Sequence, residues 1–134
     1  MTDIWFVEPE HIDSVWEETE HLIQRTDDRE SNSQDIYKAV KSGQWQLILV
    51  IGEKGIQAAC TVSFVYYPTG NKMCRIETVA GDNIQEWAYH LQSVEEWAKL
   101  NKCVAMDIFG RKGWEKFLKP SNYEFEAVLL RKYF

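Results

Sequence analysis

The chain has 134 residues, of which 45% are hydrophobic and 27% are charged, so it is too apolar for a disordered protein and is typical of one globular domain spanning residues 1–134. Its formal net charge of -6 argues against a protein that holds nucleic acid mainly by neutralising phosphates. No run of about 18 apolar residues occurs, so we expect no membrane-spanning segment.

The cysteines and histidines of the sequence indicate whether disulfide bonds or a metal site are to be expected. Cys60, Cys74 and Cys103 are odd in number, widely spaced and surrounded by apolar residues. They predict reduced thiols in the core of a cytosolic protein. The three histidines are far apart in the sequence and none pairs with another at helical spacing, so no metal site is predicted.

The first elements are predicted from hydrophobic spacing. A β-branched and aromatic run at residues 4–7 predicts a strand, and Pro9 stands where the first turn of a helix tolerates proline. Apolar residues then recur at helical spacing over residues 12–23. A capping-box pattern at residues 31–34 predicts a second, shorter helix, which Gly43 is placed to end.

Three strands joined by hairpins follow in the predicted order. Residues 45–51 are almost continuously apolar, and GEKG at residues 52–55 is a hairpin loop. Residues 56–67 alternate with the period of a strand that has one strongly apolar face. After a turn at residues 68–71, residues 73–79 predict a fourth strand.

The last part of the chain predicts a βαβ unit. Ile84 to Ala98 presents one apolar helical face, and residues 103–109 predict a buried strand. Trp114 and its neighbours mark a short helix, and residues 125–133 alternate as a final strand. A βαβ unit must be parallel, so an antiparallel meander that leads into it predicts a mixed α/β sheet.

The stretch VAGDNIQEW, residues 79–87, joins the fourth strand to the following helix at the sheet edge where α/β proteins bind ligands. In one interpretation its backbone N–H groups hold a phosphate, and the basic turn at residues 110–113 forms a second anion site. In the alternative it is an ordinary turn, in which Asp82 or Asn83 caps the helix. A capping carboxylate would repel a phosphate, which favours the second interpretation.

The order of elements and several segments resemble the GNAT acetyltransferase fold over nearly the whole chain: IWFVEPEHIDSVW, KMCRIETVAG, IQEWAYHLQSVEEWAKLNK, CVAMDIFG and GWEKFLKPSNYEF. The succession VAG, EEWAKLNKC and GRKGWEKFL is especially similar to small GNAT-like proteins of bacteriophages, some of them acetyltransferases and others virion-associated. The resemblance implies that acetyl-CoA, if bound, contacts Val79, Ala80, Gly81, Asp82, Asn83, Ile84 and Arg111.

The sequence departs from the pattern of this family at two places. The family's pyrophosphate loop has Gln or Arg, two residues, Gly, one residue, then Gly or Ala, whereas Gly81 is the only glycine in VAGDNIQEW. Leu118 stands where members often place a tyrosine that protonates the leaving thiolate. Tyr123 lies nearby in sequence, but we expect it to pack the final strand.

Two carboxylates are candidates for chemistry. Glu77, near the end of the fourth strand, is a weak candidate for a general base, since burial would raise its pKa toward neutral. The alternative is a cross-strand partner for a lysine or arginine. Asp107 either faces the ligand edge or caps a turn.

These observations support two functions of different classes. The first is a phage-type GNAT-fold protein with a degenerate acetyl-CoA loop, in the host cytoplasm or the virion, which binds a protein partner and for which Trp97 is the candidate anchor. The alternative is an acetyl-CoA-dependent N-acyltransferase. The resemblance also implies possible homo-oligomers formed through residues 125–134; neither a membrane nor nucleic acid is an expected partner.

Overall fold

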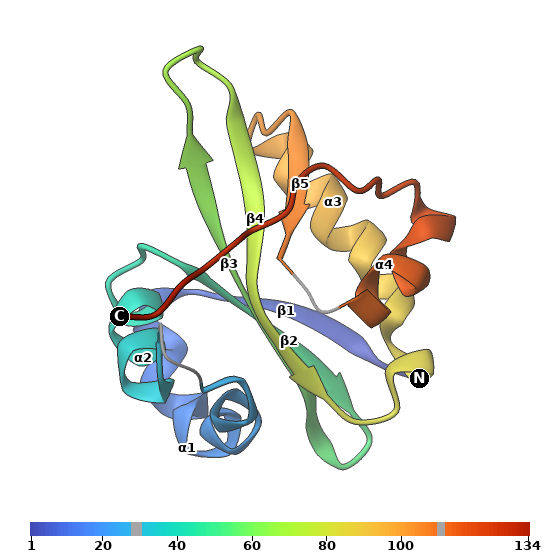
Figure 1. Cartoon of the computed structure of the whole chain (residues 1–134). Coiled ribbons are helices and arrows are strands. Elements are labelled where there is room, and N and C mark those ends of the chain that lie inside the picture. Colours follow the sequence, from blue (N-terminus) through green and yellow to red (C-terminus); the bar gives the residue numbers. More distant parts are fainter. Residues whose placement is uncertain (28–30, 110–111) are drawn as a thin grey trace.

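A computed structural model describes residues 1–27, 31–109 and 112–134 of the chain, and its arrangement is shown in Figure 1. Within these ranges the strands form one sheet in the order β1-β2-β3-β4-β5. Neighbouring strands are antiparallel from β1 to β4, and β5 lies parallel to β4, so the predicted mixed α/β sheet is confirmed. The strands are β1 (Asp3–Val7), β2 (Gln46–Gly52), β3 (Gly55–Tyr66), β4 (Lys72–Gly81) and β5 (Ala105–Ile108).

One face of the sheet is covered by α1 (Ile12–Ile23) and α2 (Ser33–Lys41) (Figure 1). The capping box of α2 lies one residue later than the pattern at residues 31–34 predicts: the side chain of Asn32 accepts hydrogen bonds from the backbone of Gln34 and Asp35, and the Asp35 carboxylate accepts from the backbone of Asn32. The apolar stripes of both helices pack on alternate side chains of β1, β2, β3 and β4. This first core contains Val7, Ile12, Leu22, Ile23, Ile36, Val40, Leu47, Leu49, Ala59 and Ala80.

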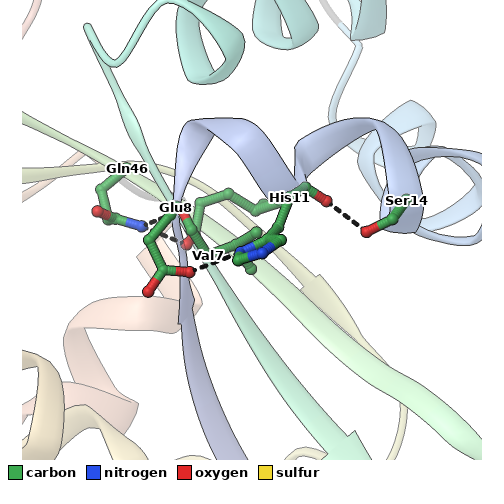
Figure 2. Close-up of polar contacts among 6 residues, drawn as sticks. Val7, Glu8, His11, Ser14 and Gln46 are labelled. Carbon is green, nitrogen blue, oxygen red and sulfur yellow. Dashed lines mark hydrogen bonds and ion pairs between the residues drawn. The ribbon is translucent and has the colours of Figure 1, made fainter.

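The turn from β1 into α1 is held by side chains that satisfy its backbone (Figure 2). Gln46 donates from Nε2 to the carbonyl of Val7 at 2.9 Å. The His11 ring lies 3.0 Å from the Glu8 carboxylate, and this hydrogen bond holds the pKa of Glu8 below its usual value. Ser14 donates its hydroxyl to the carbonyl of His11 at 2.7 Å and not to the ring. Ser14 and Gln46 thus satisfy carbonyl groups of the turn, and the side chains of Glu8, His11 and Ser14 do not form a Ser-His-Glu catalytic triad.

The opposite face carries α3 (Leu91–Leu100) and α4 (Lys112–Leu118) (Figure 1). Trp97 of α3 lies between Phe6 and Phe64, with ring centroids 5.3 Å from each. The expectation that Trp97 anchors a partner is therefore wrong, because the indole is packed inside the fold. The buried residues of this second core are Ile48, Val62, Cys74, Ile76, Val94 and Ala98.

The α-helix of the βαβ unit begins later than its apolar pattern predicts. Two 3-10 turns, η3 (Ile84–Glu86) and η4 (Ala88–His90), precede α3, and Trp87 between them has a φ of -135° that interrupts the helix. The Trp87 indole donates to the carbonyl of Asp82 at 2.8 Å. This local hydrogen bond, between residues five apart in the sequence, folds the first turns back onto the loop, so the helical period does not hold there.

The two predicted C-terminal strands also differ from the structure. β5 is shorter than residues 103–109 and lies at the sheet edge, so it is half-buried, and Val104 and Phe109 on either side are exposed. Residues 123–134 have no regular secondary structure, so the strand expected at 125–133 is not formed. This segment runs across the molecule toward α2 (Figure 1), and no described strand pairs with it in the sheet. Among the described helices, none has both the length and the hydrophobicity to span a bilayer.

Candidate functional site

The site forms where β4 and β5 stop pairing. The two strands are in register from Met73 opposite Ala105 to Ile76 opposite Ile108, but β4 continues to Gly81 (Figure 1). On that edge, residues 77–81 have no neighbouring strand within the described chain. Their outward N–H and C=O groups can therefore pair with an extended ligand.

A β-bulge lies at the point of separation. Thr61 of β3 pairs with Thr78, whereas the next residue, Val62, pairs with Ile76, which leaves Glu77 as an extra residue in β4. Beyond the bulge Val79 packs on the same core as Ile76, so the alternation of β4 has shifted by one residue. Bulges of this kind redirect side chains and are frequent beside active sites.

A cavity of about 510 Å³ follows this edge of β4. Its size falls within the roughly 300–1,000 Å³ range of small-molecule sites. Side chains from β4, from the turns before α3, from the end of β5 and from α4 line it, and they are mainly apolar. They include Ile76, Glu77, Thr78, Val79, Trp87, Leu91, Ile108, Trp114 and Leu118.

A smaller cavity of about 240 Å³ opens at the end of β4. Four of the residues predicted to contact a cofactor line it: Val79, Ala80, Gly81 and Ile84. Asp82 and Asn83 belong to the same loop but do not line either cavity. Arg111, the remaining predicted contact, lies outside the described residues, as does Gly110.

Glu77 has a partner that neither sequence interpretation predicted. Its carboxylate accepts a hydrogen bond of 2.6 Å from the hydroxyl of Ser63 on β3, and it forms no ion pair within the described part of the chain. Arg75 instead pairs with Asp107 at 3.3 Å and lies over the ring of Phe109, so Asp107 does not cap a turn. Glu77 is thus a half-buried carboxylate that lines the larger cavity and is held by one hydroxyl.

The predicted self-cap of the loop is not formed. No side chain caps η3, and Asn83 at its start has left-handed backbone angles, with φ 56° and ψ 58°. The carboxylate of Asp82 turns away from the helix start and pairs with Arg25 at 2.9 Å. The Asp82 carboxylate therefore does not occupy the N–H groups at the start of η3, so the objection that a side-chain cap blocks an anion there fails.

Gly81 has a structural reason to be glycine. A Cβ built at this position would lie 2.5 Å from the Cβ of Ala58 and 2.8 Å from the carbonyl oxygen of Gln57 on β3. Both distances are shorter than real Cβ contacts, and the Gln57 carbonyl belongs to the backbone of β3, which cannot move aside as a flexible side chain can. The glycine of VAGDNIQEW thus allows β4 to approach β3, whatever binds in the loop.

Arg25 is the functional candidate that the sequence analysis missed. It lies in η2 (Gln24–Thr26), the turn that ends α1, and lines both cavities. Its partner Asp82 is 57 residues away in the sequence, so no local spacing indicates the contact. His90 was missed in the same way: it is buried, lines the larger cavity and lies 2.9 Å from the hydroxyl of Thr2.

Tyr123 is not placed to protonate a leaving group. Its hydroxyl donates to the Glu95 carboxylate of α3 at 2.7 Å, and burial together with this carboxylate raises its pKa well above the usual value. Leu118, at the position where related proteins have a tyrosine, is buried and lines the larger cavity. Neither residue therefore supplies the proton donor that the family resemblance implies.

The thiols do not form a nucleophilic or metal site. Burial raises the pKa values of Cys60 and Cys74 to about 12, so both remain protonated at neutral pH. All three cysteines are free, as predicted. Across the described ranges no group of three or more His, Cys, Asp or Glu side chains is arranged to hold a metal ion.

Several solved structures with the same architecture are named as acetyltransferases. Glucosamine-6-phosphate N-acetyltransferase from Arabidopsis thaliana matches with a TM-score of 0.71 and 13% identity, over 100% of this chain and 99% of that one. A predicted acetyltransferase with acetyl-CoA from Clostridium acetobutylicum matches with a TM-score of 0.70 and 11% identity, over 99% of this chain and 96% of that one. An aminoglycoside acetyltransferase from an uncultured soil metagenomic sample, in complex with trehalose, matches with a TM-score of 0.74 and 10% identity, over 99% of this chain and 95% of that one.

These matches show that the chain has the GNAT fold, which confirms the fold that the sequence segments resemble. No protein-family model matches the chain, and no curated protein matches its sequence. Identities of 10 to 14% concern the architecture alone. Activity must be argued from the site itself.

Proposed function

We propose that this protein is an acetyl-CoA-dependent N-acyltransferase. The observation that carries the proposal is the separation of β4 from β5 at the Glu77 bulge, which opens an apolar cavity beside unpaired strand backbone. The similarity in fold to acetyltransferases supports this function over a purely structural role.

The chemistry of acetyl-CoA suits this cavity. Its pantetheine arm is an extended chain with two amides, which can add to the free edge of residues 77–81 as a short strand would. Val79, Leu91 and Ile108 line the cavity with apolar surface for the methylene groups between the amides. The diphosphate would then lie near the loop that follows β4, beside Gly81 and Ile84.

Glu77 is the proposed general base. An acceptor ammonium group loses a proton to its carboxylate, and the free amine attacks the thioester carbonyl. The new C–N bond forms as the C–S bond breaks, the nitrogen releases its second proton to solvent, and coenzyme A leaves as a thiolate. The Ser63 hydroxyl fixes the carboxylate in position. Since Leu118 cannot donate a proton, the thiolate takes its proton from solvent.

The test of this role is Glu77→Gln. We expect kcat/KM to fall by about 10²- to 10⁴-fold, as for loss of a general base, with an unchanged Kd for acetyl-CoA. Release of the coenzyme A thiol measures turnover with a panel of amines that begins with amino sugars and aminoglycosides, the acceptors named for two of the similar structures. Ser63→Ala should cause a smaller loss. Full activity of the Gln variant would exclude Glu77 as the base.

A second candidate function rests on a different feature, the C-terminal segment. Phe125 is 66% exposed and Leu130 is 87% exposed, and Val128, Leu129 and Phe134 are exposed as well. Apolar side chains in such a row favour a binding surface for a protein, either a second copy of the chain or the virion or host partner of a phage-type module. In this case the loop after β4 would be degenerate and the protein would not bind acetyl-CoA.

Light scattering tests this surface. A chain that assembles through the segment exceeds its 15.8 kDa monomer mass at micromolar concentration, and truncation after Tyr123 should return it to the monomer. A full-length chain that stays monomeric would contradict self-association, and an unchanged assembly after truncation would place the interface elsewhere.

A further inference from the structure

Arg25 lies at the end of β4 although it belongs to the turn after α1. Its guanidinium Nη1 is 2.9 Å from Oδ1 of Asp82, and the residue lines both cavities together with Val79. Among the described residues that line either cavity, it is the only lysine or arginine. The loop VAGDNIQEW itself contains no basic residue.

The ion pair of Arg25 can be exchanged at low cost. The two side chains are 50% and 64% exposed, and ion pairs at such exposure contribute little to stability. A diphosphate carries more than one negative charge and accepts paired hydrogen bonds from the planar guanidinium. It would therefore displace a single solvated carboxylate from Arg25.

The loop does not depend on this ion pair for its conformation. The carbonyl of Asp82 accepts from the Trp87 indole at 2.8 Å and from the side chain of Gln57 at 3.3 Å. The backbone N–H of Asp82 donates to the carbonyl of Gln57 at 3.2 Å. These contacts hold the backbone, so the Asp82 carboxylate can lose its partner while the loop stays in place.

We propose that Arg25 is the diphosphate-binding cation of this protein, which exchanges its pair with Asp82 for the diphosphate of acetyl-CoA. The inference rests on the proposed function. Arg25, supplied from the turn that ends α1, takes the place of the basic residue that the loop VAGDNIQEW lacks. Asp82 then competes with the ligand, since both are acceptors for the same guanidinium.

Calorimetric titration with two probes tests the inference. The probes are acetyl-CoA and S-acetylpantetheine, which has the same arm and thioester but no diphosphate. Arg25→Gln should weaken acetyl-CoA about 10- to 100-fold, the loss expected for a charged hydrogen bond, and leave S-acetylpantetheine unchanged. Asp82→Asn should tighten acetyl-CoA by about 2- to 5-fold, since it removes the competing charge of a surface pair.

Lys41→Gln is the matched control. Lys41 forms a similar exposed ion pair, 2.8 Å from Asp13 on the helices α1 and α2, and lines neither cavity. The Lys41→Gln substitution changes the net charge by the same amount as Arg25→Gln. Because Lys41 lies away from both cavities, the affinity of this variant for acetyl-CoA should equal that of the wild type. Circular dichroism should show that every variant keeps its helices and its thermal midpoint.

Two outcomes would overturn the inference in distinguishable ways. If the wild type binds acetyl-CoA and Arg25→Gln binds it equally well, Arg25 does not hold the diphosphate, while the proposed function stands. If both probes lose affinity equally in Arg25→Gln, the residue supports the cavity and does not contact the diphosphate. If the folded wild type does not bind acetyl-CoA, the proposed function fails and the inference fails with it.

Discussion

Glu77 illustrates how one residue can acquire a functional position through register alone. It is the extra residue of a bulge, and the bulge lies one residue beyond the last pairing of β4 with β5. The hydroxyl of Ser63 replaces the lysine or arginine that a carboxylate on a strand ordinarily pairs with. A carboxylate without a cationic partner among the described residues is free to attract an ammonium group.

The buried thiol of Cys74 makes the free energy of unfolding depend on pH in the alkaline range. Burial raises its pKa to about 12, whereas in the unfolded chain it titrates near 9.0. Between these values the unfolded state has released a proton that the native state retains. The free energy of unfolding therefore falls as pH rises, by about 1.4 kcal/mol per pH unit for this thiol.

Cys74→Ala removes that contribution, and denaturant unfolding at several pH values measures it. The difference in unfolding free energy between wild type and variant should be constant from pH 6 to 8 and should shrink above pH 9. Stability curves that stay parallel up to pH 11 would show that Cys74 ionises equally in both states.

At the scale of elements, the approach of β4 to β3 makes Gly81 a structural residue. Gly81→Ala places its Cβ against Ala58 and the backbone of Gln57, so we expect a loss of about 1–3 kcal/mol in unfolding free energy. Gly52→Ala is the matched control, because the nearest obstacle there is the end of the flexible Gln57 side chain. Thermal and denaturant unfolding compare the two.

The expected ranking is that Gly52→Ala costs clearly less than Gly81→Ala. Equal stability of the two variants would mean that β4 can move away from β3 without loss. Since the loop after β4 starts at Gly81, such freedom would also weaken the argument that its geometry is fixed in advance of ligand binding.

Elements that are defined by local patterns could be predicted from the sequence. The period of residues 12–23 and the cap at residues 31–34 gave α1 and α2, and alternation gave β3 and β4. The strand at residues 125–133 could not be judged this way, because alternation makes a strand possible but only a neighbouring strand makes it form. The delayed start of α3 accompanies a local hydrogen bond from the Trp87 side chain to the carbonyl of Asp82, which the apolar period of residues 84–98 does not indicate.

At the scale of the whole molecule, the site combines elements that are distant in sequence. βαβ geometry alone indicates the edge of β4 and the loop after it as a place for a ligand, and residues of this edge line both cavities. Arg25 and Ser63 could not be predicted, since each reaches the site only through the packing of α1 and β3 against β4. Sequence patterns thus indicated the sheet edge along which the cavity lies, but not the polar side chains that reach it from α1 and β3.

The fold has two cores, one on each face of a single sheet, and the cavity lies where β5 leaves that sheet. The sheet and both cores are complete among the described residues without a ligand, so we expect a stable protein in which binding can be measured directly. The account therefore depends most on whether this preformed cavity takes acetyl-CoA.

Isothermal titration of the purified, folded chain with acetyl-CoA tests this central claim most directly. The account predicts one binding site per chain with a Kd in the micromolar range. Absence of binding heat up to millimolar acetyl-CoA, at two temperatures and with a native circular dichroism spectrum, would contradict it and leave the exposed C-terminal segment as the functional surface of the protein.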